Sequence, residues 1–136
     1  MTLTRMGITN VTDSVLSDIL DALDENTMPL IAETSGTFSF DETSAAEQQV
    51  VSFAITGRTK ITSIWFDMTN VTQDTDIRLY HEVDSANSRL FQENAWVTTD
   101  DDGVLIDGFA VGGDFRIVMI CGGGGAGSVD VPYQVI

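Results

Sequence analysis

The sequence predicts a mainly β protein, an antiparallel β-sandwich or jelly roll of about eight strands, with a short N-terminal amphipathic helix. From Gly36 onward apolar and polar residues alternate with a period of two, as side chains do along strands. Clusters of Gly, Asn, Asp and Ser interrupt this pattern at short intervals and mark turns. No helical pattern separates the predicted strands, which argues against the long crossovers that a parallel sheet requires.

One helical pattern lies near the N-terminus, from about Val11 to Asp24. Asn10 is a suitable helix cap, and Pro29 prevents the helix from continuing. Its apolar residues recur at three- and four-residue steps and form a stripe made of Val15, Leu16, Ile19, Leu20 and Leu23. About four helical turns are marginal in isolation, so the stripe needs a partner.

We therefore divide the chain into two parts. Residues 1–30 are an N-terminal arm and helix, expected to dock or to oligomerise, and residues 31–136 are a β-sandwich domain. The alternative is that the stripe covers the sandwich of its own chain. A helix near the end of the chain, before a proline-containing connector, is compatible with both arrangements.

Eight segments have the composition and period of strands. They are Thr37–Asp41, Gln48–Thr56, Ile61–Met68, Asp76–Val83, Arg89–Glu93, Val104–Val111, Phe115–Cys121 and Val129–Ile136. The stretch Thr75–Phe91 predicts a β-hairpin with a polar turn, around which the other strands are expected to assemble. The segment Phe115–Cys121 is almost continuously apolar, which predicts a central strand covered on both faces. Pro132 predicts that the last strand lies at a sheet edge or carries a bulge.

The charge of the chain limits its partners. There are 21 acidic and 6 basic residues, which give a formal net charge of −15. Because nucleic-acid binding needs a basic surface that neutralises phosphates, we expect no nucleic-acid partner. No apolar run reaches the roughly 18–20 residues that span a bilayer, so we expect no membrane partner. The acid excess indicates a soluble, self-repelling surface, and adaptation to high salt or calcium binding are the alternatives.

No motif in the sequence nominates a reaction. The glycine cluster at 122–127 lacks the lysine and the helix that follow a phosphate-binding loop, which favours a flexible connection between strands. The acidic run Asp100–Asp102 lacks the spacing of a calcium-binding loop and indicates a solvated turn. His81 and Cys121 are each the sole residue of their type, and both are expected to be structural. We therefore expect no enzymatic activity and no cofactor, with calcium kept as an alternative.

Trp65 and Trp96 are the candidate ligand-stacking residues. Exposed aromatic rings on a β-sandwich can stack on sugars, so a carbohydrate- or receptor-binding module is the second function considered. Core or interface packing of both rings is the simpler explanation.

The hairpin and the later strands resemble those of small β-sandwich structural proteins encoded by tailed viruses and proviruses of bacteria and archaea. The matching residues are Asp74–Asp84, Asn87, Arg89–Phe91, Gly113–Val118 and Val131–Ile136. The resemblance implies a virion component, such as a capsid-decorating, turret or fibre-base protein. It also implies a homo-oligomer, a trimer or another cyclic assembly, located on the capsid surface or an appendage. Its partners would be copies of itself and the major capsid protein or other virion proteins.

Overall fold

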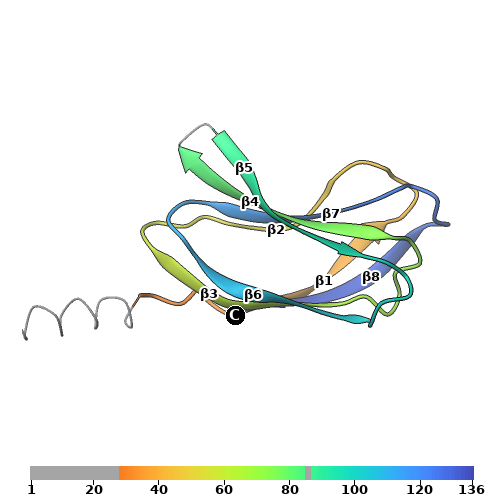
Figure 1. The fold of residues 1–136 in the computed structure, drawn as a ribbon, viewed down its shortest axis with the longest axis horizontal. Helices are drawn as coiled ribbons and strands as arrows, with labels where there is room; N and C mark the ends of the chain where they lie inside the picture. The colour runs from red at the N-terminus through yellow and green to blue at the C-terminus, as the bar shows by residue number, and fades with distance from the viewer. Residues whose placement is uncertain (1–27, 85–86) are drawn as a thin grey trace, which may run out of the picture.

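The structure is a computed structural model that describes residues 28–84 and 87–136. In these residues the chain forms eight antiparallel strands in two four-stranded sheets, so the predicted antiparallel sandwich of about eight strands is confirmed (Figure 1). The predicted helix and its stripe lie outside the described residues. Nowhere in the described part is there a helix that is long and apolar enough to cross a membrane.

Each predicted segment corresponds to one strand, and the strand ends differ from the predicted ends by no more than three residues. The strands are β1 (Thr34–Asp41), β2 (Gln48–Phe53), β3 (Thr59–Asp67), β4 (Thr75–Asp84), β5 (Asn87–Trp96), β6 (Gly103–Val111), β7 (Phe115–Cys121) and β8 (Ser128–Val135). Before β1, Leu30 already forms a bridge with Lys60 at the start of β3.

The strand order shows how the chain is wound. One sheet has the order β1-β8-β3-β6, which we call sheet A, and the other has the order β2-β7-β4-β5, which we call sheet B. The pairs β1–β8, β2–β7, β3–β6 and β4–β5 join strands from the two ends of the domain inward. The domain is therefore one long hairpin, with β4–β5 at its tip, rolled into two sheets. This is the arrangement of a jelly roll.

The core lies between the two sheets and follows from the alternation of side chains along each strand. In β3, Ile64 and Phe66 are buried whereas Trp65 and Asp67 between and after them are exposed. Burying an aliphatic or aromatic side chain of this kind contributes about 1.5–3 kcal/mol relative to leaving it exposed. The side chains with no exposed surface come from both sheets and include Phe40, Ile61, Ile64, Ile77, Leu79, Ile117, Met119, Val131 and Val135.

β7 and β8 test two of the predictions. β7 is an interior strand of sheet B, as predicted, and both Ile117 and its neighbour Val118 are buried although they belong to opposite faces. β8 is also an interior strand, so the edge position predicted from Pro132 is wrong. The ladder between β8 and β3 covers only Tyr133–Val135 and ends beside Pro132, which has no N–H to donate. The fold therefore accepts this proline at the point where one ladder stops.

The antiparallel strands place the connections at two poles. The β1–β2, β3–β4, β5–β6 and β7–β8 connections meet at one pole, which we call the Glu42 pole. The end of β4 and the start of β5 lie at the other, the hairpin pole, where the described chain also begins (Figure 1). β4 pairs with β7 only as far as His81, but with β5 as far as Asp84. The end of the hairpin therefore extends beyond the sandwich as two strands alone.

Candidate functional site

The structure separates the two tryptophans that the sequence grouped together. Trp96 is 5% exposed and its indole N–H donates to the Asp101 carbonyl oxygen at 2.9 Å, so its ring is part of the core. Trp65 is 44% exposed on the outer face of sheet A. Its indole N–H donates to the Ser63 hydroxyl at 3.0 Å, which satisfies the polar edge of the ring within its own strand. Only Trp65 has a ring face available to a ligand.

A surface groove of about 500 Å³ lies beside this ring, and we call it the Trp65 groove. It lies where the β3–β8 ladder ends, with Pro132 and Tyr133 of β8 in its lining. Gln134 on β8 and Leu105 on β6 are the cross-strand neighbours of Trp65. The volume is within the range of about 300–1,000 Å³ that is usual for small-ligand sites.

Two carboxylates belong to the lining of the groove. Asp67 lies two residues after Trp65 on the same face of β3, and its register partner Gly103 directly follows Asp102. One oxygen of Asp67 accepts hydrogen bonds from the backbone and the hydroxyl of Thr69, at 3.0 and 2.5 Å. These bonds lower the pKa of Asp67, so it is charged at neutral pH. No lysine or arginine lines the groove, so its field is negative.

The hairpin pole carries a second set of exposed side chains. Leu30, Val83, Leu90 and Phe91 are all exposed, and Val83 is the most exposed of them at 65%. The Phe91 ring makes T-shaped contacts with the rings of His81 and Phe109, with ring centres 6.3 and 5.1 Å apart. β5 is also the outer strand of sheet B, so one of its edges is unpaired within the described sheets. Exposed apolar side chains on an edge strand are typical of a contact with another chain.

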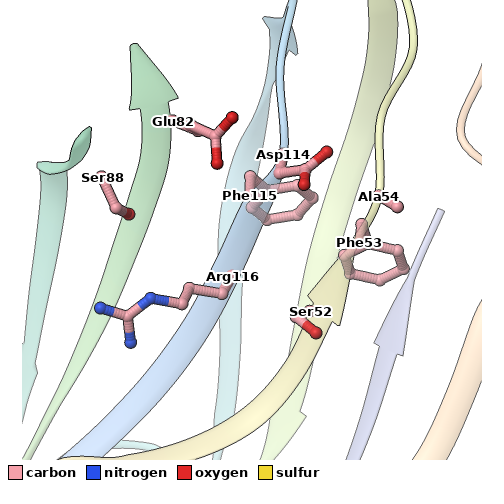
Figure 2. A pocket seen from close by; sticks show the side chains of 8 residues that line it. All are labelled: Ser52, Phe53, Ala54, Glu82, Ser88, Asp114, Phe115 and Arg116. Carbon is pink, nitrogen blue, oxygen red and sulfur yellow. The ribbon is translucent and has the colours of Figure 1, made fainter. Parts of the chain in front are cut away.

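A cavity of about 300 Å³ lies beside the base of the hairpin, across β2, β7 and β4. Figure 2 shows the rings of Phe53 and Phe115 in its lining, together with the carboxylates of Glu82 and Asp114. The two rings are stacked with centres 4.9 Å apart. Asp114 accepts a hydrogen bond from the Ile55 N–H at 2.8 Å, so this carboxylate holds the β2–β3 connection. The arrangement explains local structure and does not assemble reacting groups.

An ionic cluster covers the outer face of sheet B. The Arg78 guanidinium bonds to Glu93 at 2.5 Å and Glu47 at 2.9 Å, and Tyr80 donates its hydroxyl to the same oxygen of Glu47. The bonds from Tyr80 and Arg78 lower the pKa of Glu47, and the same bond to Glu47 raises the pKa of Tyr80. Arg116 lies over the Tyr80 ring, 4.2 Å from its centre. The cluster binds its own members and connects the β1–β2 loop to β4.

The glycine-rich connection is also explained by local structure. The Gly125 N–H donates to the Glu42 carbonyl oxygen, and the Glu42 N–H donates to the Gly127 carbonyl oxygen, both at 3.0 Å. Gly123 has a φ of 76°, a conformation that favours glycine. The segment is therefore hydrogen-bonded to the β1–β2 connection, in contrast to the flexible connection that the sequence predicted.

The other singled-out residues have structural partners. His81 accepts a hydrogen bond from the Gly112 N–H at 3.3 Å. Cys121 is buried, with its sulfur 3.5 Å from the Ser44 carbonyl oxygen. The Asp100 carboxylate accepts from the Val97 N–H at 3.0 Å and closes the acidic turn. Over residues 28–84 and 87–136, no three His, Cys, Asp or Glu side chains are placed to hold a metal ion.

Fold and site together define a jelly-roll sandwich with an acidic groove on one sheet and exposed apolar residues at one pole. No protein-family model matches the chain, and no curated protein matches it. A solved structure with some similarity is that of the Yersinia pseudotuberculosis-derived mitogen, at 11% identity and a TM-score of 0.45, covering 76% of this chain and 86% of the mitogen chain. A similarity this low supports no conclusion about function.

Proposed function

We propose that this protein is a non-enzymatic structural subunit of a virus particle, a capsid-decorating, turret or fibre-base protein that assembles as a homo-oligomer. The observation that carries the proposal is that four exposed apolar side chains (Leu30, Val83, Leu90 and Phe91) belong to the strand ends at the hairpin pole. The described chain enters the fold at this same pole, because Leu30 bridges to Lys60 at the start of β3. Residues 1–27, which carry the predicted apolar stripe, are therefore joined to the body at this pole.

The body supports such a role without requiring it. Its core is formed between two sheets by residues from Ile31 to Val135. Jelly rolls serve in viral capsids, but also in lectins and other proteins, so the fold alone does not decide between functions. The apolar pole adds a surface suited to contact with copies of the same chain or with a shell. The net charge of −15 then keeps the remaining surface in solvent.

The assembly can be tested by measuring molar mass with light scattering. We expect the full chain to be an oligomer, and we expect deletion of residues 1–28 to reduce the number of copies per oligomer. Leu90→Ser at the hairpin pole should weaken the oligomer, whereas Val97→Ser at the Glu42 pole is the matched control and should leave the mass unchanged. Both replace an exposed apolar side chain by serine. A monomeric full chain, or equal effects of the two serine variants, would contradict assembly through the hairpin pole.

The virion role needs a second experiment. Particles of the virus or provirus that encodes this chain should show it in regular copies on the shell or an appendage when imaged by electron microscopy with a bound antibody fragment. Purified particles that lack the chain would reject the virion role, even if the protein is an oligomer.

A further inference from the structure

We infer that the Trp65 groove receives an arginine side chain from a partner protein. The groove lies at the Glu42 pole, away from the apolar hairpin pole, so this binding goes beyond the proposed assembly and does not depend on it. Three features of the groove carry the inference: an available aromatic face, two carboxylates beside it, and no positive charge in its lining.

The aromatic face is the first feature. The Trp65 ring is held between Leu105 and Gln134 in the cross-strand row of sheet A, and its N–H is already bonded to Ser63. What it offers to a ligand is therefore its π-face, which attracts cations. A guanidinium is planar and less strongly hydrated than an ammonium, so it stacks on such a ring better than lysine does.

The carboxylates are the second feature. Thr69 occupies only one oxygen of Asp67, and no hydrogen bond to the Asp102 carboxylate is found in the described residues. The Asp102 carbonyl oxygen is bonded to the Met68 N–H at 2.7 Å, which fixes the backbone that carries this side chain. A guanidinium above Trp65 can donate to carboxylates at the groove rim while its plane covers the ring.

Charge selects among possible occupants. Carboxylates in the lining and a net charge of −15 oppose anionic ligands, including acidic side chains of another copy. A metal ion is not favoured, because no suitable group of three ligands is found in the described residues. Neutral sugars could stack on Trp65, but they would gain nothing from the negative field. A basic protein surface that presents arginine gains from both the ring and the field.

The test uses acetyl-arginine-amide as the probe and acetyl-citrulline-amide as its neutral counterpart of nearly the same shape. The full chain contains two tryptophans, so the indole N–H signals of Trp65 and buried Trp96 can be followed separately by NMR. We expect the arginine compound to shift the Trp65 signal, with a dissociation constant at least roughly tenfold lower than that of the citrulline compound. Added salt should weaken the binding.

Variants locate the site. Asp67→Asn and Asp102→Asn should each weaken arginine binding roughly threefold, because each removes one exposed charge partner. Asp107→Asn is the matched control, since Asp107 is exposed on β6 but does not line the groove. These changes are nearly isosteric, and the spectrum itself reports whether each variant is folded.

Three outcomes would overturn the inference. They are equal binding of arginine and citrulline compounds, equal effects of Asp107→Asn and Asp67→Asn, and a Trp65 shift with neutral hexoses but not with arginine. The last would assign the groove to sugars. These NMR measurements are independent of the molar mass, so failure of arginine binding is distinguishable from failure of the proposed assembly.

Discussion

At the Glu42 pole one buried residue, Glu42, is hydrogen-bonded to two other connections, whereas at the hairpin pole β4 and β5 leave the sandwich as a two-stranded extension. Glu42 is 1% exposed, and its carboxylate accepts three hydrogen bonds from Thr72 and Gln73 at 2.8–3.0 Å. Its backbone bonds to Gly125 and Gly127 as well. Within the described residues, the extension beyond His81 has no such closure and exposes Val83.

The difference shows that one pole of this fold is built for stability of the domain and that the other is suited to contact with another chain. A buried carboxylate is retained only where its acceptors are well satisfied, because an unpaired one is costly. The Glu42 carboxylate fixes the β3–β4 connection relative to β1, and the Glu42 backbone fixes the β7–β8 connection. A two-stranded hairpin is marginal by itself, and apolar residues on it gain more by burial against another chain. The comparison therefore predicts large stability effects at the Glu42 pole and small ones at the hairpin pole.

The largest effect is expected from Glu42→Ala. The change leaves the N–H groups of Thr72 and Gln73 and the Thr72 hydroxyl without their acceptor, so the free energy of unfolding should fall by about 2–4 kcal/mol. Urea denaturation measures this. Glu82→Gln, which alters an acidic residue at the hairpin pole, should change the free energy by less than about 0.5 kcal/mol. Equal losses in the two variants would remove the distinction between the poles.

A smaller effect is expected from Gly125→Ala. A Cβ atom at this position would lie 2.4 Å from the Glu42 Cβ, so the connection must shift and the free energy of unfolding should fall by about 1–3 kcal/mol. Gly127→Ala is the matched control, because a Cβ there meets nothing within 4 Å. If the two alanine variants melt at the same temperature, close packing on Glu42 is not the reason for glycine at position 125.

The smallest effect is a pH dependence that arises from Glu47, which holds β4 near the base of the hairpin through Tyr80 and Arg78. The folded-state pKa of Glu47 lies below its ordinary value of 4.5. Its stabilisation is therefore present above about pH 4.5 and is lost as pH falls through the lowered pKa. For a partly exposed ion pair the contribution is up to about 1 kcal/mol.

Glu47→Gln should accordingly reduce the loss of stability between about pH 5 and pH 3, measured as the change in urea midpoint. Asp41 and Asp67, whose pKa values are also lowered by neighbouring threonines, keep their own contributions in both proteins. An unchanged pH profile in the variant would show that the cluster does not hold β4.

The same comparison shows what the sequence could predict. Period-two alternation located all eight strands, and the apolar run at Phe115–Cys121 gave the bounds of β7, because both signals are local. The hairpin followed from its turn residues. The hydrogen bonds of Glu42 could not be predicted, since they join residues 42, 72 and 125, which belong to three different connections. The edge position predicted from Pro132 was wrong for a related reason. The missing N–H of a proline is a local signal, and it does not reveal that the ladder between β3 and β8 ends beside this residue.

The site was predictable only in part. The exposure of Trp65 follows from its position between Ile64 and Phe66, whereas Trp96 could not be placed in the core without the paired sheets. Asp67 belongs to the face of Trp65 by alternation alone. Asp67 lines the same groove as Asp102 and Pro132 because of the order of strands in sheet A, and no local sequence pattern predicts that order.

The pairing of β1 with β8 has a consequence for biosynthesis. Thr34 pairs with Val135, and Phe40 with Val129, so this ladder joins the first strand to the last. Such non-local contacts slow folding, and the first strand waits until the ribosome has released the last. If residues 1–27 associate as proposed, they can meet newly made copies during that interval, so association and folding are expected to compete in time.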